Sequence, residues 1–239
     1  MNIVLLPQHT QNIITLTDSI LLNHLHQVLK AQVGYSIKVG VVQGNLGTAV
    51  IDSLTDTSVT LNHIDCPTHP PTKLPLTVVL ALPRPKVLRR LILDMTAMGV
   101  RELYLVNSYR SEKSYWQSPL INKIDDYIQE GLQQACDTVP MQVHLKKRLK
   151  PFVEDELPSI IGKQQAIIAH PYADDAISRV WQPQQPSVLV IGAEGGFIPY
   201  EVALFSKVGC TPAHMGTRIL RTENAVNLLC GHALLAQQN

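Results

Sequence analysis

Short apolar runs that alternate with helical stretches restrict the fold of the C-terminal two thirds of the chain more than any other feature. They cover residues 76–82, 103–106, 141–145, 166–169 and 188–191. Such runs are typical of strands buried on both faces, and helices between them allow neighbouring strands to lie parallel. The pattern therefore predicts an α/β domain whose parallel sheet is covered by helices on both faces.

Two of the intervening helices can be placed from their apolar periodicity. A helix that begins at Lys86 would bury the residues at helical spacing, which are Leu88, Leu91, Ile92 and Met95. The last helix would begin near Thr222, which is a plausible N-cap. It would turn Ala225, Leu228 and Leu229 inward.

The N-terminal part has a different texture. Short alternating segments at residues 36–42, 47–53 and 58–64 are separated by turn dipeptides, and one helix is expected at about residues 18–29. This pattern predicts a small antiparallel barrel. Four prolines within residues 66–75 then disfavour both a helix and a central strand. We therefore expect a barrel domain at residues 1–68, a proline-rich linker at 69–75 and the α/β domain at 76–239.

Two glycine-containing segments in the last third indicate a ligand site. The first, residues 188–197, reads VLVIGAEGGF, and the second, residues 215–225, reads MGTRILRTENA. Glycine lets a ligand lie directly against the backbone, whose bare N–H and C=O groups could recognise both edges of a purine. A nucleoside cofactor would fit between two such loops. A Gly-Gly pair after a strand is also common in a plain tight turn, so the functional interpretation depends on the two segments together.

These two segments resemble the C-terminal motifs of the RsmE family. That family belongs to the SPOUT class and uses S-adenosylmethionine to methylate N3 of a uridine in 16S ribosomal RNA. Its usual motifs read Gly-Pro-Glu-Gly-Gly and Arg-Ile-Leu-Arg-x-Glu-Thr-Ala, so this chain departs from them at Ala193 and Asn224. The resemblance covers essentially the whole chain. It implies a PUA-like RNA-binding barrel at the N-terminus, a SPOUT methyltransferase domain with a C-terminal trefoil knot, and a homodimer. In-line methyl transfer from a sulfonium needs no metal, so none is expected.

The resemblance also implies roles for particular residues. Those expected to hold S-adenosylmethionine are Gly192, Glu194, Gly195, Gly196, Met215, Gly216, Ile219 and Leu220. Contact with RNA phosphates is expected from the basic residues Arg89, Arg90, Arg110, Lys113 and Arg218, on the basis of their charge; the alternative for each is a solvated surface residue.

Catalysis is expected from Arg221 and Glu223. The uridine N3 must lose its proton, and a nearby cation would stabilise the developing negative charge, which is the role expected of Arg221. Glu223 could orient Arg221 or accept the proton. The alternative for this pair is a structural ion pair at a helix start, where glutamate is favoured.

Composition limits the setting. The net charge of +1 is low for an RNA-binding protein, so basic surface must be local. The N-terminus does not resemble a signal peptide and no apolar run approaches the roughly 20 residues of a membrane span, which predicts a cytoplasmic protein without a membrane partner. The four cysteines are far apart in sequence, so zinc and disulfide interpretations are weak.

Two other functions stay open at this point. Asp137 stands where relatives are expected to carry arginine, which together with the near-neutral charge would suit a divergent SPOUT paralogue that methylates another RNA. The chain could also be a non-catalytic RNA-binding or ribosome assembly protein. Kinase and dehydrogenase functions are disfavoured because the sequence contains neither a phosphate-binding G-x-x-x-x-G-K-[ST] loop nor a G-x-G-x-x-G turn.

Overall fold

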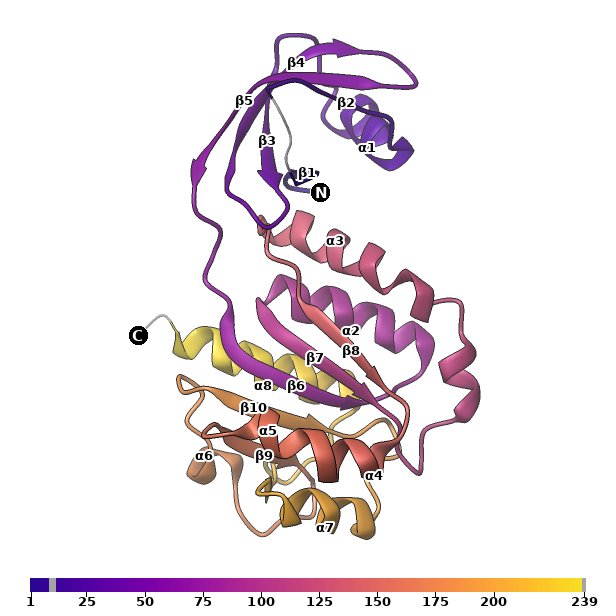
Figure 1. Cartoon of the computed structure of the whole chain (residues 1–239), viewed down its shortest axis with the longest axis vertical. Helices are drawn as coiled ribbons and strands as arrows, with labels where there is room; N and C mark the ends of the chain where they lie inside the picture. Colours follow the sequence, from indigo (N-terminus) through magenta and orange to yellow (C-terminus); the bar gives the residue numbers. More distant parts are fainter. Residues whose placement is uncertain (9–11, 238–239) are drawn as a thin grey trace. The chain divides into compact units, whose positions relative to one another are not determined.

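The computed structural model describes residues 1–8 and 12–237, which form two compact units (Figure 1). The first unit comprises Met1–Thr72 together with Ile128–Pro140. The second comprises Lys73–Tyr127 and the chain from Met141 onward. The sequence predicted contiguous domains and did not anticipate that residues 128–140 pack with the first unit. The domain limits themselves stay a prediction.

The first unit is built on a five-stranded sheet in the order β1-β3-β4-β5-β2. Its strands are β1 (Val4–Leu6), β2 (Ile14–Leu16), β3 (Ser36–Val41), β4 (Leu46–Leu54) and β5 (Val59–Thr68). The predicted strands and helix are confirmed: α1 (Ser19–Asn23) continues into the π-helical turn η1 (His24–Val28). The side chain of Asp18 caps α1 by accepting a hydrogen bond of 2.7 Å from the Leu21 N–H.

The prediction of a wholly antiparallel barrel was wrong in one respect. Strand β1 pairs with β3 in parallel, because the chain between them runs through β2 and the α1–η1 helix rather than through a tight turn. The described pairings leave β1 and β2 as outer strands, so the sheet is an open half-barrel. This arrangement is consistent with a PUA-like domain. Its core contains Leu6, Leu25, Val39, Ile51 and Leu61.

Residues 128–140 join this unit through backbone hydrogen bonds. The N–H groups of Asn2 and Ile3 donate to the carbonyl of Gln133 on helix α3 (Ile124–Ala135), at 3.0 and 3.3 Å. After the helix, the buried carboxylate of Asp137 accepts hydrogen bonds from the N–H groups of residues 138 and 139, at 2.7 and 2.9 Å. Asp137 thus stabilises a turn at the end of α3, as aspartate commonly does.

The second unit contains a six-stranded sheet in the order β11-β9-β10-β6-β7-β8, and all its pairings are parallel. Its strands are β6 (Leu74–Ala81), β7 (Val100–Val106), β8 (Gln142–Lys146), β9 (Gln165–Ala169), β10 (Ser187–Ile191) and β11 (Thr211–Ala213). The five predicted strands are confirmed, and so is the parallel α/β class. The prediction missed β11, which has three residues and contains Pro212.

Helices cover both faces of this sheet (Figure 1). On one face α2 (Pro85–Ala97) and α8 (Thr222–Ala236) pack against each other and against β6, β7 and β10. On the other face, η4 (Phe152–Glu156), α5 (Leu157–Ile161) and α7 (Pro199–Lys207) share a core with alternate strand residues such as Val79 and Val190. Shorter helical segments complete the unit: η2 (Lys113–Gln117), η3 (Ile121–Lys123), α4 (Leu149–Pro151) and α6 (Ile177–Val180).

The two predicted helices are present, with two corrections. The inward residues predicted for α2 are all buried, as are Ala225 and Leu229 on α8. Leu228, however, is 54% exposed, because it lies on the side of α8 away from the sheet. Thr222 is the first helical residue rather than the N-cap, which is Arg221. The Thr222 hydroxyl instead donates to the carbonyl of Gly192 at 3.2 Å.

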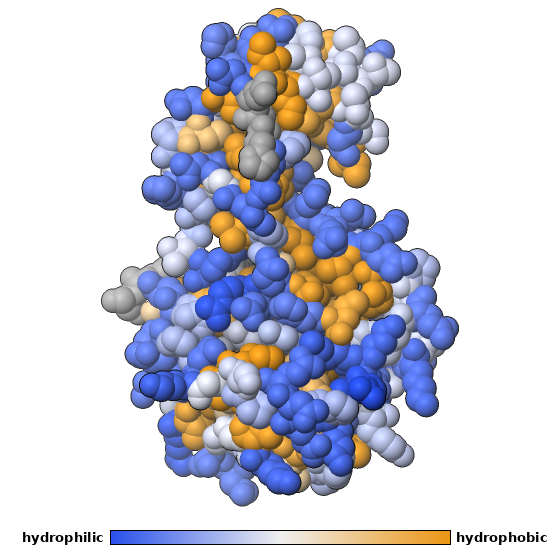
Figure 2. Space-filling model, viewed as in Figure 1, coloured by the Kyte–Doolittle hydropathy of each residue, from blue (hydrophilic) through white to orange (hydrophobic). Residues whose placement is uncertain are grey.

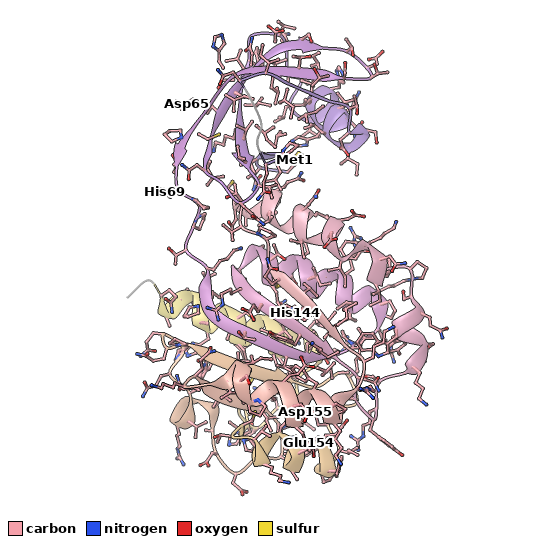
Figure 3. All side chains as sticks on the ribbon, in the orientation of Figure 1. Met1, Asp65, His69, His144, Glu154 and Asp155 are labelled. Atoms are coloured by element: carbon pink, nitrogen blue, oxygen red, sulfur yellow. The ribbon has the colours of Figure 1, made fainter. Side chains whose placement is uncertain are left out.

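Polar side chains cover much of the visible surface, with apolar patches between them (Figure 2). On β8 the ring of His144 (Figure 3) stacks on Tyr104, with 4.4 Å between the ring centroids. Burial, followed by the neighbouring Glu102 carboxylate, raises the pKa of Tyr104 to about 12. Tyr104 therefore serves as a neutral packing residue.

The parallel arrangement determines where a ligand site can form. All six strands point the same way, so the loops that follow them gather at one edge of the sheet, where α/β proteins usually bind ligands. None of these strand pairings tests the trefoil knot, which stays a prediction.

Candidate functional site

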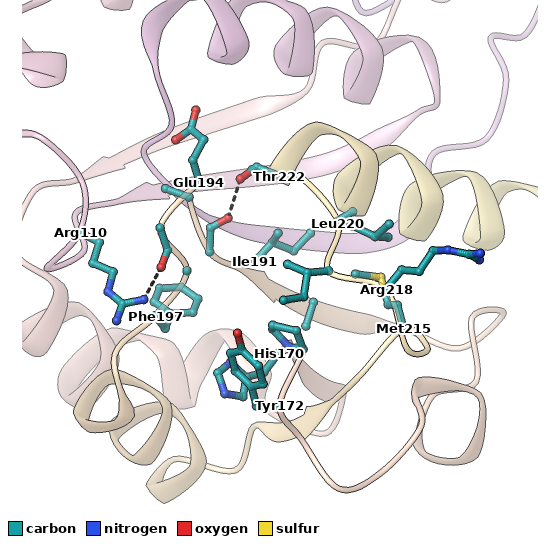
Figure 4. A pocket seen from close by; sticks show the side chains of 18 of the residues that line it. Arg110, His170, Tyr172, Ile191, Glu194, Phe197, Met215, Arg218, Leu220 and Thr222 are labelled. Carbon is teal, nitrogen blue, oxygen red and sulfur yellow. Dashed lines mark hydrogen bonds between the residues drawn. The ribbon is translucent and has the colours of Figure 1, made fainter.

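A cavity of about 490 Å³ lies at this edge of the sheet (Figure 4). The loops after β9, β10 and β11, three neighbouring strands, line it, and the loop after β7 adds one arginine. The lining residues are Arg110, Ala169, His170, Pro171, Tyr172, Ile191, Gly192, Ala193, Glu194, Gly195, Gly196, Phe197, Pro199, Met215, Arg218, Ile219, Leu220, Thr222 and Ala225. Its volume is in the range usual for small-molecule sites.

The glycine loop after β10 doubles back on itself, which explains its composition. The N–H of Gly196 donates to the carbonyl of Ala193 at 2.8 Å, and Gly196 has a φ of +65°, which disfavours other residues. A Cβ on Gly192 would lie 3.0 Å from the Cα of Gly196. The loop therefore exposes backbone rather than side chains to the cavity.

Arg110 holds the glycine loop from the side. Its guanidinium donates a hydrogen bond of 2.6 Å to the carbonyl of Gly195, drawn as a dashed line in Figure 4. A Cβ on Gly195 would lie only 2.8 Å from the Cβ of Arg110. Glycine at this position thus allows the close approach of the arginine.

The buried carboxylate of Glu201 connects the loop after β7 to the start of α7. It accepts hydrogen bonds from the Tyr109 N–H at 2.7 Å and from the Ile198 N–H at 3.0 Å. Ile198 is the N-cap of α7 and Glu201 is in its first turn, so the second contact is the glutamate half of a capping box. The Glu201 side chain therefore holds both Tyr109, which precedes Arg110, and Ile198, which follows the glycine loop.

The loops after β9 and β11 are tied together by backbone hydrogen bonds. His170 N–H donates to the carbonyl of Ala213 at 2.9 Å, and His214 N–H donates to the carbonyl of Asp175 at 2.8 Å. The His214 ring then accepts from the N–H of Gly216, whose φ of +106° makes glycine the favoured residue there. This turn directs residues 215–220 toward the cavity.

His170 and Tyr172 form an aromatic wall of the cavity (Figure 4). Their rings meet edge to face, with centroids 5.7 Å apart at an angle of 76°. Burial lowers the pKa of His170, which favours a neutral imidazole at neutral pH. Neither residue was among the predicted site residues. The signal that could have found them is their position directly after the predicted strand at residues 166–169.

Seven of the eight residues expected to hold the cofactor line this one cavity, although their roles stay predictions. Those seven are Gly192, Glu194, Gly195, Gly196, Met215, Ile219 and Leu220, whereas Gly216 shapes the loop without lining it. The carboxylate of Glu194 accepts a hydrogen bond from the Arg84 N–H at 3.1 Å. It therefore organises the loop after β6 as well as the glycine loop.

The two expected catalytic residues lie at the start of α8, beside the cavity. Arg221 is exposed between the lining residues Leu220 and Thr222, and its side chain makes no ion pair within the described part of the chain. Glu223 faces Arg90 of α2 instead, at 3.6 Å. The structural ion pair weighed for Glu223 thus exists, with Arg90 rather than Arg221 as the partner.

The residues expected to contact RNA occupy different surroundings. Arg110 and Arg218 line the cavity, and the Arg218 side chain extends outward from its loop (Figure 4). Lys113 is exposed on η2. On α2, Arg90 pairs with Glu223, and the Arg89 guanidinium lies 5.5 Å from the centroid of the Tyr127 ring.

Three further features of residues 1–8 and 12–237 concern metal ligands, membrane-spanning helices and cysteines. No cluster of three or more His, Cys, Asp or Glu side chains in these ranges could hold a metal ion, and no helix there is long and apolar enough to cross a bilayer. The four cysteines are free thiols. Burial raises the pKa of Cys210 and of Cys230 to about 12, which makes both unreactive.

Comparison with known proteins shows the family to which the chain belongs. Residues 70–233, well over half of the chain, match the model of the RNA methyltransferase domain. The chain belongs to this RNA methyltransferase family. The matched residues include every segment that lines the cavity.

Individual relatives extend the match over nearly the full length. The chain is 29% identical to the ribosomal RNA small subunit methyltransferase E of Treponema pallidum, with 98% of this chain and 91% of that protein aligned. Its fold matches a putative methyltransferase of Legionella pneumophila solved with its cofactor, at a TM-score of 0.80 and 19% identity over 98% of this chain and 97% of that one. It also matches a ribosomal RNA small subunit methyltransferase E of Neisseria gonorrhoeae, solved with S-adenosylmethionine, at a TM-score of 0.79 and 17% identity over 97% and 96%.

Proposed function

We propose that this RNA methyltransferase uses S-adenosylmethionine to methylate N3 of a uridine in 16S ribosomal RNA. The observation that carries the proposal is the convergence of residues 192–197 and 215–220 on one cavity of about 490 Å³. The names of the Treponema and Neisseria relatives support a small-subunit RNA substrate. We also propose that the enzyme acts in the cytoplasm, because its proposed substrate is ribosomal RNA.

The chemistry of the lining fits S-adenosylmethionine. Apolar side chains, among them Ile191, Ile219 and Leu220, offer a surface for an adenosine, and the glycine loop offers backbone donors and acceptors without side-chain obstruction. When bound, the cofactor supplies a methyl group activated by a positively charged sulfur. The residues that would hold it are the glycine loop and the stretch from Met215 to Leu220.

Arg221 provides the cation that the reaction needs. Removal of the N3 proton leaves negative charge on the uracil ring, and a guanidinium beside the ring stabilises that charge. Arg221 is suited to this role because its backbone neighbours line the cavity while its own side chain is unpaired in the described structure. The carboxylate of Glu223 is already paired with Arg90 of α2. We therefore assign Glu223 to positioning the start of α8, next to Arg221, rather than to accepting the proton.

Asp137 does not argue for a different RNA. An aspartate in place of the expected arginine reverses a charge, which the sequence alone left compatible with a paralogue acting on another RNA. The Asp137 side chain is buried, and its carboxylate accepts backbone hydrogen bonds that stabilise the turn after α3. The departure thus has a structural explanation that does not require a different RNA substrate.

We further propose that the enzyme is a homodimer. Leu228 and Leu235 are 54% and 64% exposed on α8. Exposed apolar side chains gathered on one element are typical of a contact between copies. Light scattering should give twice the mass of 26.5 kDa, whereas a monomer at micromolar concentration would contradict the proposal.

The function is tested by mapping methylated uridines in small-subunit RNA from cells that lack the protein. Complementation with the wild type should restore one site, and complementation with Arg221→Ala should not. Calorimetry with S-adenosylmethionine should show that Arg221→Ala still binds the cofactor. A normal RNA profile in the deletion strain would indicate another RNA substrate, and absence of cofactor binding by the wild type would indicate a non-catalytic RNA-binding protein.

A further inference from the structure

Three tyrosines of the second unit are exposed although aromatic side chains usually bury most of their surface. Tyr109, Tyr172 and Tyr200 are 79%, 75% and 57% exposed. Within the described residues of this unit, every other tyrosine, tryptophan and phenylalanine is buried or half-buried. The three rings contribute little to the core and are free to contact a partner.

All three tyrosines belong to segments that border the cavity. Tyr172 lines it directly, with its ring against His170 (Figure 4). Tyr109 precedes Arg110 and Tyr200 follows Pro199, and both of those neighbours are lining residues. The three tyrosines therefore lie on segments that border the site: the loops after β7 and β9 and the start of α7.

The backbone beneath two of these tyrosines is held firmly. The N–H of Tyr109 donates to the buried carboxylate of Glu201, and Tyr200 is the residue next to Glu201 at the start of α7. One buried side chain thus holds the two tyrosine-bearing segments together. An exposed ring on a fixed backbone loses less conformational freedom on binding, which favours its use as a contact.

We propose that Tyr109, Tyr172 and Tyr200 form an aromatic rim on which unpaired bases of the RNA stack around the target uridine. The proposal rests on the function proposed above. Proteins recognise single-stranded RNA by stacking splayed bases on aromatic side chains, and a tyrosine ring accepts any base. The rim thus restricts the substrate to a loop, bulge or other unpaired segment.

The charges near the rim support a nucleic acid as the partner and indicate on which side of the rim its phosphates lie. Arg110 and Lys113 are exposed beside Tyr109 and, even with the exposed Glu112 between them, leave this loop with a net positive charge that can neutralise phosphates. Asp174 and Asp175 are exposed just after Tyr172 and would repel them. We therefore place the RNA backbone on the Tyr109 side, while Tyr172 receives a base.

The test uses the full-length protein and a fluorescent RNA oligonucleotide with the target uridine in an unpaired segment. Fluorescence anisotropy should show that Tyr109→Ala and Tyr200→Ala each weaken RNA binding about ten-fold. Tyr109→Phe and Tyr200→Phe should stay within about two-fold of the wild type, since phenylalanine keeps the stacking face. Cofactor affinity of the alanine variants should be unchanged in calorimetry, which also shows that they are folded.

Several results would overturn the rim. One is wild-type RNA affinity in both alanine variants of an enzyme that still methylates ribosomal RNA, which would leave the proposed function standing. Another is an equal loss in Tyr35→Ala, the matched control at an exposed tyrosine of the first unit. A third is a change of the alanine variants from dimer to monomer with unchanged RNA affinity, which would assign the tyrosines to a contact between copies. Failure of the wild type to bind the cofactor would instead refute the proposed function.

Discussion

Replacement of Glu201 by alanine should destabilise the second unit and disturb the site together. Glu201 is 3% exposed, and its carboxylate accepts two backbone hydrogen bonds, of 2.7 and 3.0 Å. A hydrogen bond to a charged group contributes about 1.5–3 kcal/mol, so the pair contributes about 3–6 kcal/mol. Water can partly replace the carboxylate at the half-buried Ile198, which favours the lower end, about 3 kcal/mol.

Glu201→Gln gives a graded comparison. The amide keeps one acceptor oxygen and presents an NH₂ group to the other backbone N–H, so about half of the effect is expected, roughly 1.5 kcal/mol. Glu112→Ala is the matched control, because Glu112 is an exposed glutamate of the loop after β7, the loop that Glu201 contacts through Tyr109. Its free energy of unfolding should stay within about 0.5 kcal/mol of the wild type.

Urea unfolding followed by tryptophan fluorescence measures this quantity. The two tryptophans, Trp116 and Trp181, both lie in the second unit, so the signal reports the unfolding of that unit. Calorimetry on the folded Glu201→Ala variant should also show weaker binding of S-adenosylmethionine, because Arg110 and the glycine loop lose their common support. The reasoning is refuted if Glu201→Ala unfolds at the wild-type urea concentration and binds the cofactor normally.

Three further predictions concern the glycine loop, the thiols and a histidine. Gly195→Ala should weaken cofactor binding roughly ten-fold in calorimetry, because its Cβ would lie 2.8 Å from that of Arg110, and Arg110→Gly in the same chain, which removes that Cβ, should remove part of this penalty. A thiol reagent at pH 8 should modify at most two cysteines of the native protein, Cys66 and Cys136, and all four after unfolding; rapid labelling of Cys210 or Cys230 would contradict their burial and raised pKa. Because burial lowers the pKa of His170, the unfolded chain takes up the proton first, so stability should fall as the pH drops below about 6.5, and His170→Asn should lose less stability between pH 7.5 and 5.5 than the wild type. An equal loss in both proteins would show that His170 does not control this pH dependence.

The sequence was sufficient for the elements whose periodicity is strong. The five buried strands of the second unit and the inward face of α2 follow from apolar patterns, which depend only on local spacing. Strand β11 has three residues and a proline, too short a signal for any periodicity. Leu228 was placed wrongly because α8 is apolar on more than one side, and sequence alone does not say which side meets the sheet.

The site was predictable in part for a related reason. The glycine loop and residues 215–220 could be paired because both segments contain glycine and together resemble the motif pair of a known family. His170 and Tyr172 directly follow the predicted strand at residues 166–169, but they were not added because the sequence does not show that β9 lies between β10 and β11 in the sheet. The contact of Arg110 with Gly195 joins residues 85 positions apart and leaves no local trace. The resemblance to a known family supplied the catalytic role of Arg221, which spacing does not give.

The grouping of residues 128–140 with residues 1–72 means that the polypeptide passes between the two units three times: near residue 72, near residue 127 and near residue 140. A protease that cuts within residues 69–73 therefore should not release the N-terminal piece, which would still be held by the α3 segment through the carbonyl of Gln133. Likewise, a truncated protein that starts at residue 73 would retain residues 128–140 but lack residues 1–72, against which they pack. Exchange of the N-terminal module between relatives thus requires the stretch at 128–140 to be transplanted along with it.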